Sequence, residues 1–123
     1  MDNIIIYNKF KATLRSDGIL YYQYSSDTTL DLTDFENSVD AYIHFSKGKT
    51  LKVLAEFPEF SSITVEAREY LQKRELPAIA EAIVFKGLSQ KILFNFYKLF
   101  RTQNYPIKGF QSKENALNWL SKY

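Results

Sequence analysis

Short apolar segments of strand length alternate with longer segments of helical periodicity along this chain. Strand-length runs lie at 51–55, 80–85 and 107–110, and each is followed by a segment whose apolar residues recur every three or four positions. Two further strand-like runs open the chain. The order ββαβαβαβα predicts an α/β fold, with a mixed sheet, an N-terminal β-hairpin and about four helices packed on the sheet.

The opening hairpin rests on residues 4–15 and 19–24. Phe10, Ala12 and Leu14 alternate with polar neighbours, which is the pattern of a half-buried strand. The turn between the runs contains Gly18, which adopts positive φ at no steric cost. We therefore expect one strand over 4–15 and a second over 19–24.

Capping signals place the helices. Thr33 with Glu36 fits a capping box, and Gly48 is a candidate terminator of the first helix. The second helix begins at Val65, and Pro77 ends it. Ser89 and Ser112 are the expected N-caps of the third and fourth helices.

Size and composition indicate one domain over residues 1–123. The chain has no cysteine, no apolar stretch of membrane-spanning length and no signal-peptide pattern at its start, so we expect a cytoplasmic protein. A net charge of +2 is too small to indicate nucleic-acid binding, and we expect no such partner.

The residue types predict no catalytic centre, metal site or cofactor, and hence no enzyme. His44 is the single histidine, so it cannot form a histidine-based metal triad, and we interpret it as a packing or helix-end residue. The four glycines stand alone, which excludes a glycine-rich phosphate loop. The acids from Asp27 to Asp40 lack the spacing of a calcium loop and are expected to form a solvated face.

Charge is separated along the chain, and the basic part coincides with the third helix. Residues 16–46 contain six acids and no Lys or Arg, whereas residues 82–113 contain six bases and no acid. The third helix is apolar over much of its circumference. Simple burial, a protein partner or self-association as a homodimer, and contact with an apolar ligand or a membrane surface all fit this pattern. Its candidate binding residues are Lys91, Phe94, Tyr97, Lys98 and Arg101.

A second candidate binding surface lies just before the second helix. Its aromatic members are Phe57 and Phe60, which we expect to be exposed beside Pro58. Ser61, Ser62 and Thr64 follow at the helix N-terminus, where free amides stabilise a phosphate group. Ordinary capping by Thr64 explains the same pattern.

Three stretches resemble the SpoIIAA-like family of STAS-type (STAS/SEC14-like) bacterial domains. They are the hairpin ending in Gly18–Tyr21, the second helix with its approach in Leu51–Tyr70, and the ending Tyr105–Phe110 followed by Ser112–Leu120. The resemblance implies a STAS-like fold and a non-enzymatic regulatory or protein-interaction module. The SEC14-like relationship implies the alternative, a carrier or sensor of a small apolar or lipid-like ligand. The stretch from Phe60 to Thr64 lacks the aspartate and glycine that flank the phosphorylated residue in STAS-type antagonists.

Overall fold

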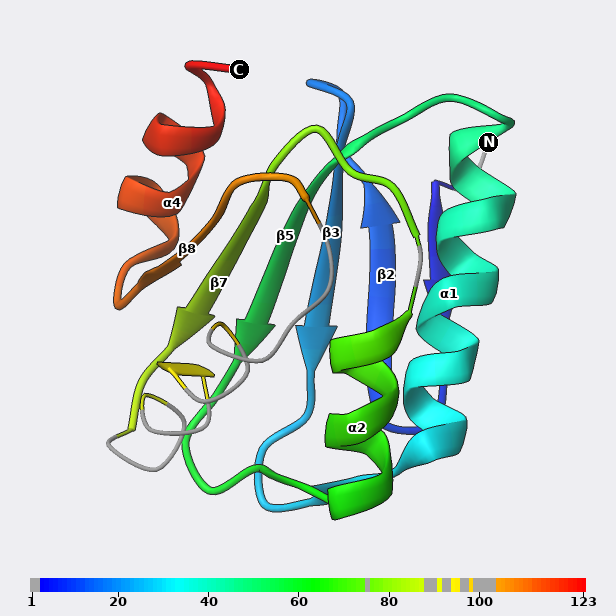
Figure 1. Cartoon of the computed structure of the whole chain (residues 1–123), viewed down its shortest axis with the longest axis vertical. Coiled ribbons are helices and arrows are strands. Elements are labelled where there is room, and N and C mark those ends of the chain that lie inside the picture. Colours follow the sequence, from blue (N-terminus) through cyan, green and yellow to red (C-terminus); the bar gives the residue numbers. More distant parts are fainter. Residues whose placement is uncertain (1–2, 75, 88–90, 92–93, 96–97, 99–103) are drawn as a thin grey trace.

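The computed structural model is an α/β domain, described here for residues 3–74, 76–87, 91, 94, 95, 98 and 104–123. Its elements follow one another as β1 (Ile4–Ile6), β2 (Phe10–Leu14), β3 (Ile19–Tyr24), β4 (Thr29–Leu30), α1 (Leu32–Ser46), β5 (Lys52–Phe57), β6 (Ser62–Ile63), α2 (Val65–Lys73), β7 (Glu81–Phe85), β8 (Ile107–Phe110) and α4 (Lys113–Leu120). Figure 1 shows their arrangement.

The main sheet is mixed, as predicted, with the order β1-β2-β3-β5-β7-β8. Strands β1, β2 and β3 are antiparallel, and β3, β5, β7 and β8 are parallel. The β2–β3 hairpin is confirmed. A single strand over residues 4–15 is wrong, because the chain turns at residues 7–9 and β1 folds back beside β2.

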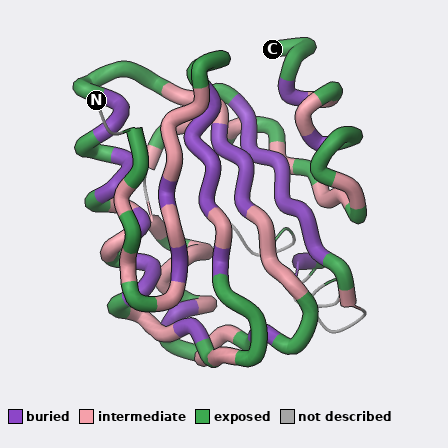
Figure 2. Tube along the Cα trace, turned by 180° about the vertical axis from the view of Figure 1, so that it is seen from behind, coloured by how far each residue is buried: buried purple, intermediate pink, exposed green. Residues whose placement is uncertain are grey.

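The sheet separates two hydrophobic layers. Helices α1 and α2 cover one face, called the front face here, and α4 packs on the other, the back face (Figure 1). The period of two divides each strand between these layers: Tyr22 and Tyr24 belong to the front core, whereas Ile19 and Tyr21 belong to the back core. Seen from behind, β1, β2 and β3 carry no described helix (Figure 2).

The first helix begins two residues earlier than predicted. Its N-cap is Asp31, whose carboxylate accepts from the Asp34 amide while the Asp34 carboxylate accepts from the Asp31 amide. The capping box is therefore Asp31–Asp34 and not Thr33–Glu36. An Asp carboxylate can form the same reciprocal hydrogen bonds as the Ser/Thr and Glu/Gln of the usual capping box, so both pairs are candidates for the start of this helix. At the other end, Lys47 is left-handed at φ 50° and Gly48 follows at φ 83°.

The other helix predictions have mixed outcomes. Helix α2 starts at Val65 with Thr64 as N-cap, and α4 follows Ser112, as expected. Three helices, rather than about four, have bounds within the described residues. Ser89 lies outside them, although Lys91, Phe94, Asn95 and Lys98 are helical. In this described part of the chain, no helix is both long enough and apolar enough to cross a membrane.

Candidate functional site

A cavity of about 70 Å³ lies on the front face, between the parallel strands and the helices that cover them. Most of its wall is aromatic or aliphatic, and three charged side chains interrupt it. The lining residues are Tyr22, Tyr24, Phe35, Ala55, Phe57, Ser61, Ile63, Arg68, Leu71, Arg74, Glu81, Ile83, Phe85 and Phe94. The cavity thus joins strands β3, β5 and β7 to α1, α2 and the segment that precedes α2.

The sheet register explains where the space comes from. Tyr22, Ala55, Ile83 and Gly109 are aligned across four neighbouring strands. The methyl group of Ala55 thus lies between the larger side chains of Tyr22 and Ile83. A protein core normally fills such positions at close-packed density, so the small residue in mid-sheet leaves a gap.

Two aromatic stacks form the wall toward the carboxyl ends of the strands. The Tyr24 and Phe57 rings lie parallel, with centroids 4.6 Å apart and planes 4° from each other. The Phe85 and Phe94 rings stack at 5.5 Å. Burial raises the pKa of Tyr24 well above its ordinary value, so its hydroxyl stays protonated at neutral pH. This wall therefore offers uncharged aromatic surface.

Gly109 makes room for the second stack. A Cβ atom built on Gly109 would lie 2.6 Å from one ring atom of Phe85 and 2.6 Å from one of Phe94. Both rings are buried, so neither can swing into solvent. The glycine is needed here because the rings occupy the space of a side chain.

A charged group lies at the amino-terminal end of β7. The Arg74 guanidinium at the end of α2 contacts the Glu81 carboxylate at 3.4 Å, with side-chain exposures of 14% and 6%. The Tyr105 hydroxyl donates to the other carboxylate oxygen of Glu81 at 3.1 Å. Both charged groups have lost most of their hydration, and their mutual attraction offsets that cost only while this contact geometry is kept.

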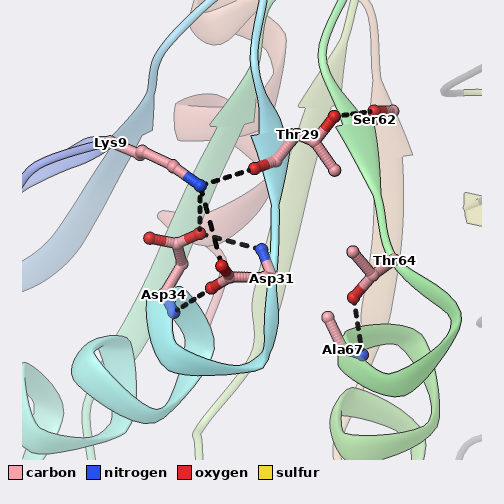
Figure 3. A network of polar contacts seen from close by, with 7 residues as sticks. All are labelled: Lys9, Thr29, Asp31, Asp34, Ser62, Thr64 and Ala67. Atoms are coloured by element: carbon pink, nitrogen blue, oxygen red, sulfur yellow. Dashed lines mark hydrogen bonds and ion pairs between the residues drawn. The ribbon is translucent and has the colours of Figure 1, made fainter.

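The segment from Phe57 to Thr64 borders the cavity at the opposite end, the carboxyl end of the strands. Its strand β6 pairs with β4 in a separate two-stranded parallel sheet. The Ser62 amide donates to the Thr28 carbonyl and the Thr64 amide donates to the Leu30 carbonyl, both at 3.0 Å. The Thr29 and Ser62 hydroxyls lie 3.0 Å apart (Figure 3). This small sheet fixes the segment against the approach to α1.

Lys9 anchors the same region from the turn between β1 and β2. Its ammonium donates to the Thr29 carbonyl at 2.8 Å and lies 3.7 Å from Asp31 and 3.6 Å from Asp34 (Figure 3). Asp34 is buried, so the expectation of a wholly solvated acidic face is wrong at this position. The two acids are part of the fold of this corner.

The residues predicted for the segment before α2 separate into different environments. Phe57 and Ser61 line the cavity, and the Ser61 hydroxyl donates to the Pro58 carbonyl at 2.9 Å. Phe57 is half-buried in its stack, so the expectation of an exposed ring is wrong there. Phe60 is 74% exposed, and Ser62 is exposed. Thr64 caps α2 by accepting from the Ala67 amide at 3.2 Å (Figure 3).

The residues predicted on the third helix are described only in part. Phe94 lines the cavity and is buried, whereas Lys91 and Lys98 are exposed. The Lys98 ammonium lies 5.7 Å from the centre of the Phe94 ring. Tyr97 and Arg101 lie outside the described residues.

Most residues of the cavity wall were not predicted from the sequence. The predicted strands contain Tyr22, Tyr24, Ile83 and Phe85. The alternation of side chains along a strand, however, does not show which of them border a cavity. Glu81 could have been identified from the sequence as a residue with a fixed polar contact, because a carboxylate at the start of an all-buried strand requires an ionic or hydrogen-bonding partner. Within the described residues, no group of three His, Cys, Asp or Glu side chains could hold a metal ion.

Comparison with solved structures shows a SpoIIAA-like fold, as predicted. An uncharacterized protein of the DUF3478 family with that fold, from Shewanella loihica PV-4, superposes with a TM-score of 0.63 at 19% identity, over 98% of this chain and 95% of that chain. A protein of unknown function from Arthrobacter sp. FB24 aligns at 21% identity over 91% of this chain and 92% of its own, with a TM-score of 0.36. No curated protein matches the chain. A family model matches residues 13–123, and the chain therefore belongs to DUF7793, a domain family of unknown function.

Proposed function

We propose that this domain binds a small ligand in the front-face cavity, as a carrier or sensor, and that it acts by binding and not by catalysis. The observation that supports the proposal is the largely aromatic cavity beside Ala55, with a charged group at one end. Binding sites for small molecules are mostly apolar concavities with a few fixed polar groups that orient the ligand. In open α/β sheets they lie toward the carboxyl ends of parallel strands, where the Phe57 and Phe85 rings stand.

The volume supports a small ligand. One water molecule needs roughly 10–15 Å³ of such volume, so a cavity of about 70 Å³ corresponds to about five water molecules. Water makes few hydrogen bonds against aromatic walls, and an apolar group of similar size gains free energy by replacing it. We therefore expect a ring-sized group to enter beside Ala55.

The test is to fill the cavity from the sheet side. Ala55→Leu places three more carbon atoms in the gap, whereas Lys52→Leu on the same strand adds an apolar side chain to the opposite face. Each variant is titrated with small aromatic compounds such as phenol, indole and benzamide, and the chemical shifts of the backbone amides are followed by NMR. We expect shifts at Tyr22 and Ile83 in the parent protein and in Lys52→Leu, and none in Ala55→Leu.

Two outcomes would refute the ligand proposal. One is the absence of amide shifts around the cavity in the parent protein at millimolar concentrations of every compound. The other is unchanged binding in Ala55→Leu, which would place the compounds elsewhere on the molecule. Native mass spectrometry of protein purified from its own host adds an independent measurement, because a retained ligand appears as added mass.

A second candidate function, contact with a protein partner, is favoured by Phe60. Its ring is 74% exposed, and its backbone adopts a left-handed φ of 63° that non-glycine residues rarely accept. An exposed aromatic ring on a constrained backbone is a typical protein-contact residue. Since the neighbouring Ser61 lines the cavity, a STAS-type regulatory module could report ligand occupancy to a partner through this segment.

Affinity capture from the native cell tests this second function. Phe60→Ser removes the exposed ring, and Val65→Ser removes another exposed apolar side chain from the start of α2 as a control. We expect a partner that is lost with Phe60→Ser and retained with Val65→Ser. Identical sets of captured proteins for the parent and both variants would contradict a role of Phe60 in recognition.

A further inference from the structure

We propose that the ligand is an organic acid, with an apolar ring in the cavity and a carboxylate held by arginine. This inference rests on the proposed ligand-binding function and names the chemical class that the site selects. It depends on the charged residues of the cavity wall, which are Arg68, Arg74 and Glu81.

The two arginines come from one face of α2. Arg68, Leu71 and Arg74 follow at steps of three residues, and all three line the cavity. The Arg68 amide donates to the Thr64 carbonyl at 3.0 Å, so Arg68 lies in the first turn, next to the segment that borders the cavity. Arg74 lies at the other end of the helix, beside Glu81. Two arginines, from the first turn and the C-terminal end of α2, thus contribute to the cavity wall.

Guanidinium chemistry favours a carboxylate ligand. A guanidinium presents five N–H donors in a planar fork that matches carboxylate geometry, so it can hold a protein acceptor and a ligand oxygen at the same time. Such charge-assisted bonds are shorter and roughly twice as strong as those between neutral groups. Their strength increases further beside aromatic walls that exclude water.

Glu81 does not make the site selective for cations. One of its carboxylate oxygens contacts the Arg74 guanidinium at 3.4 Å, and the other accepts from the Tyr105 hydroxyl at 3.1 Å. Both oxygens therefore face donors supplied by the protein. An amine entering the cavity would have to compete with these donors and would also meet the charge of Arg68.

Three probes of nearly equal shape separate the alternatives: 3-phenylpropanoate, 3-phenylpropanamide and 3-phenylpropan-1-amine. Their dissociation constants are measured by calorimetry and by NMR titration with the full chain. We expect the carboxylate to bind at least tenfold more tightly than the amide and the amine. The difference should decrease as salt is added, because a partly exposed charge pair is screened.

Two charge-matched variants test the assignment. Arg68→Gln removes a cation from the cavity wall, whereas Lys73→Gln removes one from an exposed position of the same helix. We expect Arg68→Gln to reduce carboxylate affinity at least tenfold and to reduce amide affinity by a smaller factor, and Lys73→Gln to change neither.

The outcomes separate this inference from the proposed function. Equal affinities for the three probes, together with loss of binding in Ala55→Leu, would overturn the acid assignment and leave a general ligand site in place. Preferential binding of the amine would overturn it as well. If none of the probes binds the parent protein, the ligand-binding function fails together with the assignment.

Discussion

Substitution of Gly109 by alanine is the most direct test of the packing that borders the cavity. The added Cβ would lie 2.6 Å from a ring atom of Phe85 and 2.6 and 2.9 Å from two ring atoms of Phe94. Real Cβ contacts are longer, so both buried rings must shift. Forcing extra volume into a packed core costs about 1–3 kcal/mol, and the smaller unfolded-state entropy of alanine returns roughly 0.5 kcal/mol. We expect Gly109→Ala to lower the unfolding free energy by about 0.5–2.5 kcal/mol.

Urea denaturation at pH 7 measures this loss, and a thermal melt should show a decrease in melting temperature of roughly 2–10 °C for a domain of this size. Lys108→Ala, on the same strand but exposed, is the matched control and should change stability by less than about 0.5 kcal/mol. In a Phe94→Ala background one of the two opposing rings is absent, so the cost of Gly109→Ala should fall. An undiminished cost in that background, or full stability of the single variant, would refute the reasoning.

Three further predictions concern the charged and capping groups. Arg74→Met should destabilise the domain by about 3–5 kcal/mol, because it leaves the Glu81 charge buried without its cation. The double variant Arg74→Met with Glu81→Leu should recover most of that loss in urea denaturation. A double variant as unstable as the single one would contradict this explanation. The hydrogen bond from the Asp34 amide lowers the pKa of Asp31 below its unfolded value, so its contribution to stability is present at neutral pH and is lost as pH falls through the lowered pKa. Asp31→Asn should accordingly be less stable than the parent at pH 7 and equal to it near pH 2, and a gap that persists in acid would exclude the carboxylate charge as its cause. Ser112→Ala removes the side chain that accepts from the Asn115 amide at 3.2 Å, and we expect a loss of about 1 kcal/mol, while Ser121→Ala at the exposed end of the same helix should lose less.

The sequence was sufficient for the order of the main elements because their signals are local. The β2–β3 hairpin, the central strand β5, and the caps Thr64 and Ser112 depend on side chains within a few positions of each other. Errors arose where two local signals compete. Asp31 with Asp34 and Thr33 with Glu36 both satisfy capping rules, and the ion pairs of Lys9 add to the first of them.

Short strands were not predictable from the sequence. Strands β4 and β6 have two residues each and exist because they pair with each other across more than thirty residues. Their sequences, Thr29–Leu30 and Ser62–Ile63, carry no periodicity. The turn at residues 7–9 was missed for a related reason, since the apolar residues of 4–6 and 10–14 read as one continuous run.

The cavity depends on alignment between strands, which a single sequence does not contain. Ala55 is unremarkable in the run from Leu51 to Phe57 and becomes informative only when it lies between Tyr22 and Ile83. The segment 57–64 was identified from its aromatic residues and helix-start chemistry, but which of its side chains point inward could not be derived. Phe57 faces Tyr24, while Phe60 faces solvent.

The row of Tyr22, Ala55, Ile83 and Gly109 has a consequence for how such domains can diversify. Backbone pairing in a sheet does not depend on side-chain volume, so a change from alanine to valine or glycine at position 55 would alter the size of the cavity without changing the strand register. The volume of the cavity can thus change while the strand pairing stays the same. A single inherited substitution at this position would therefore change the shape of the interior of a descendant while its architecture remained the same.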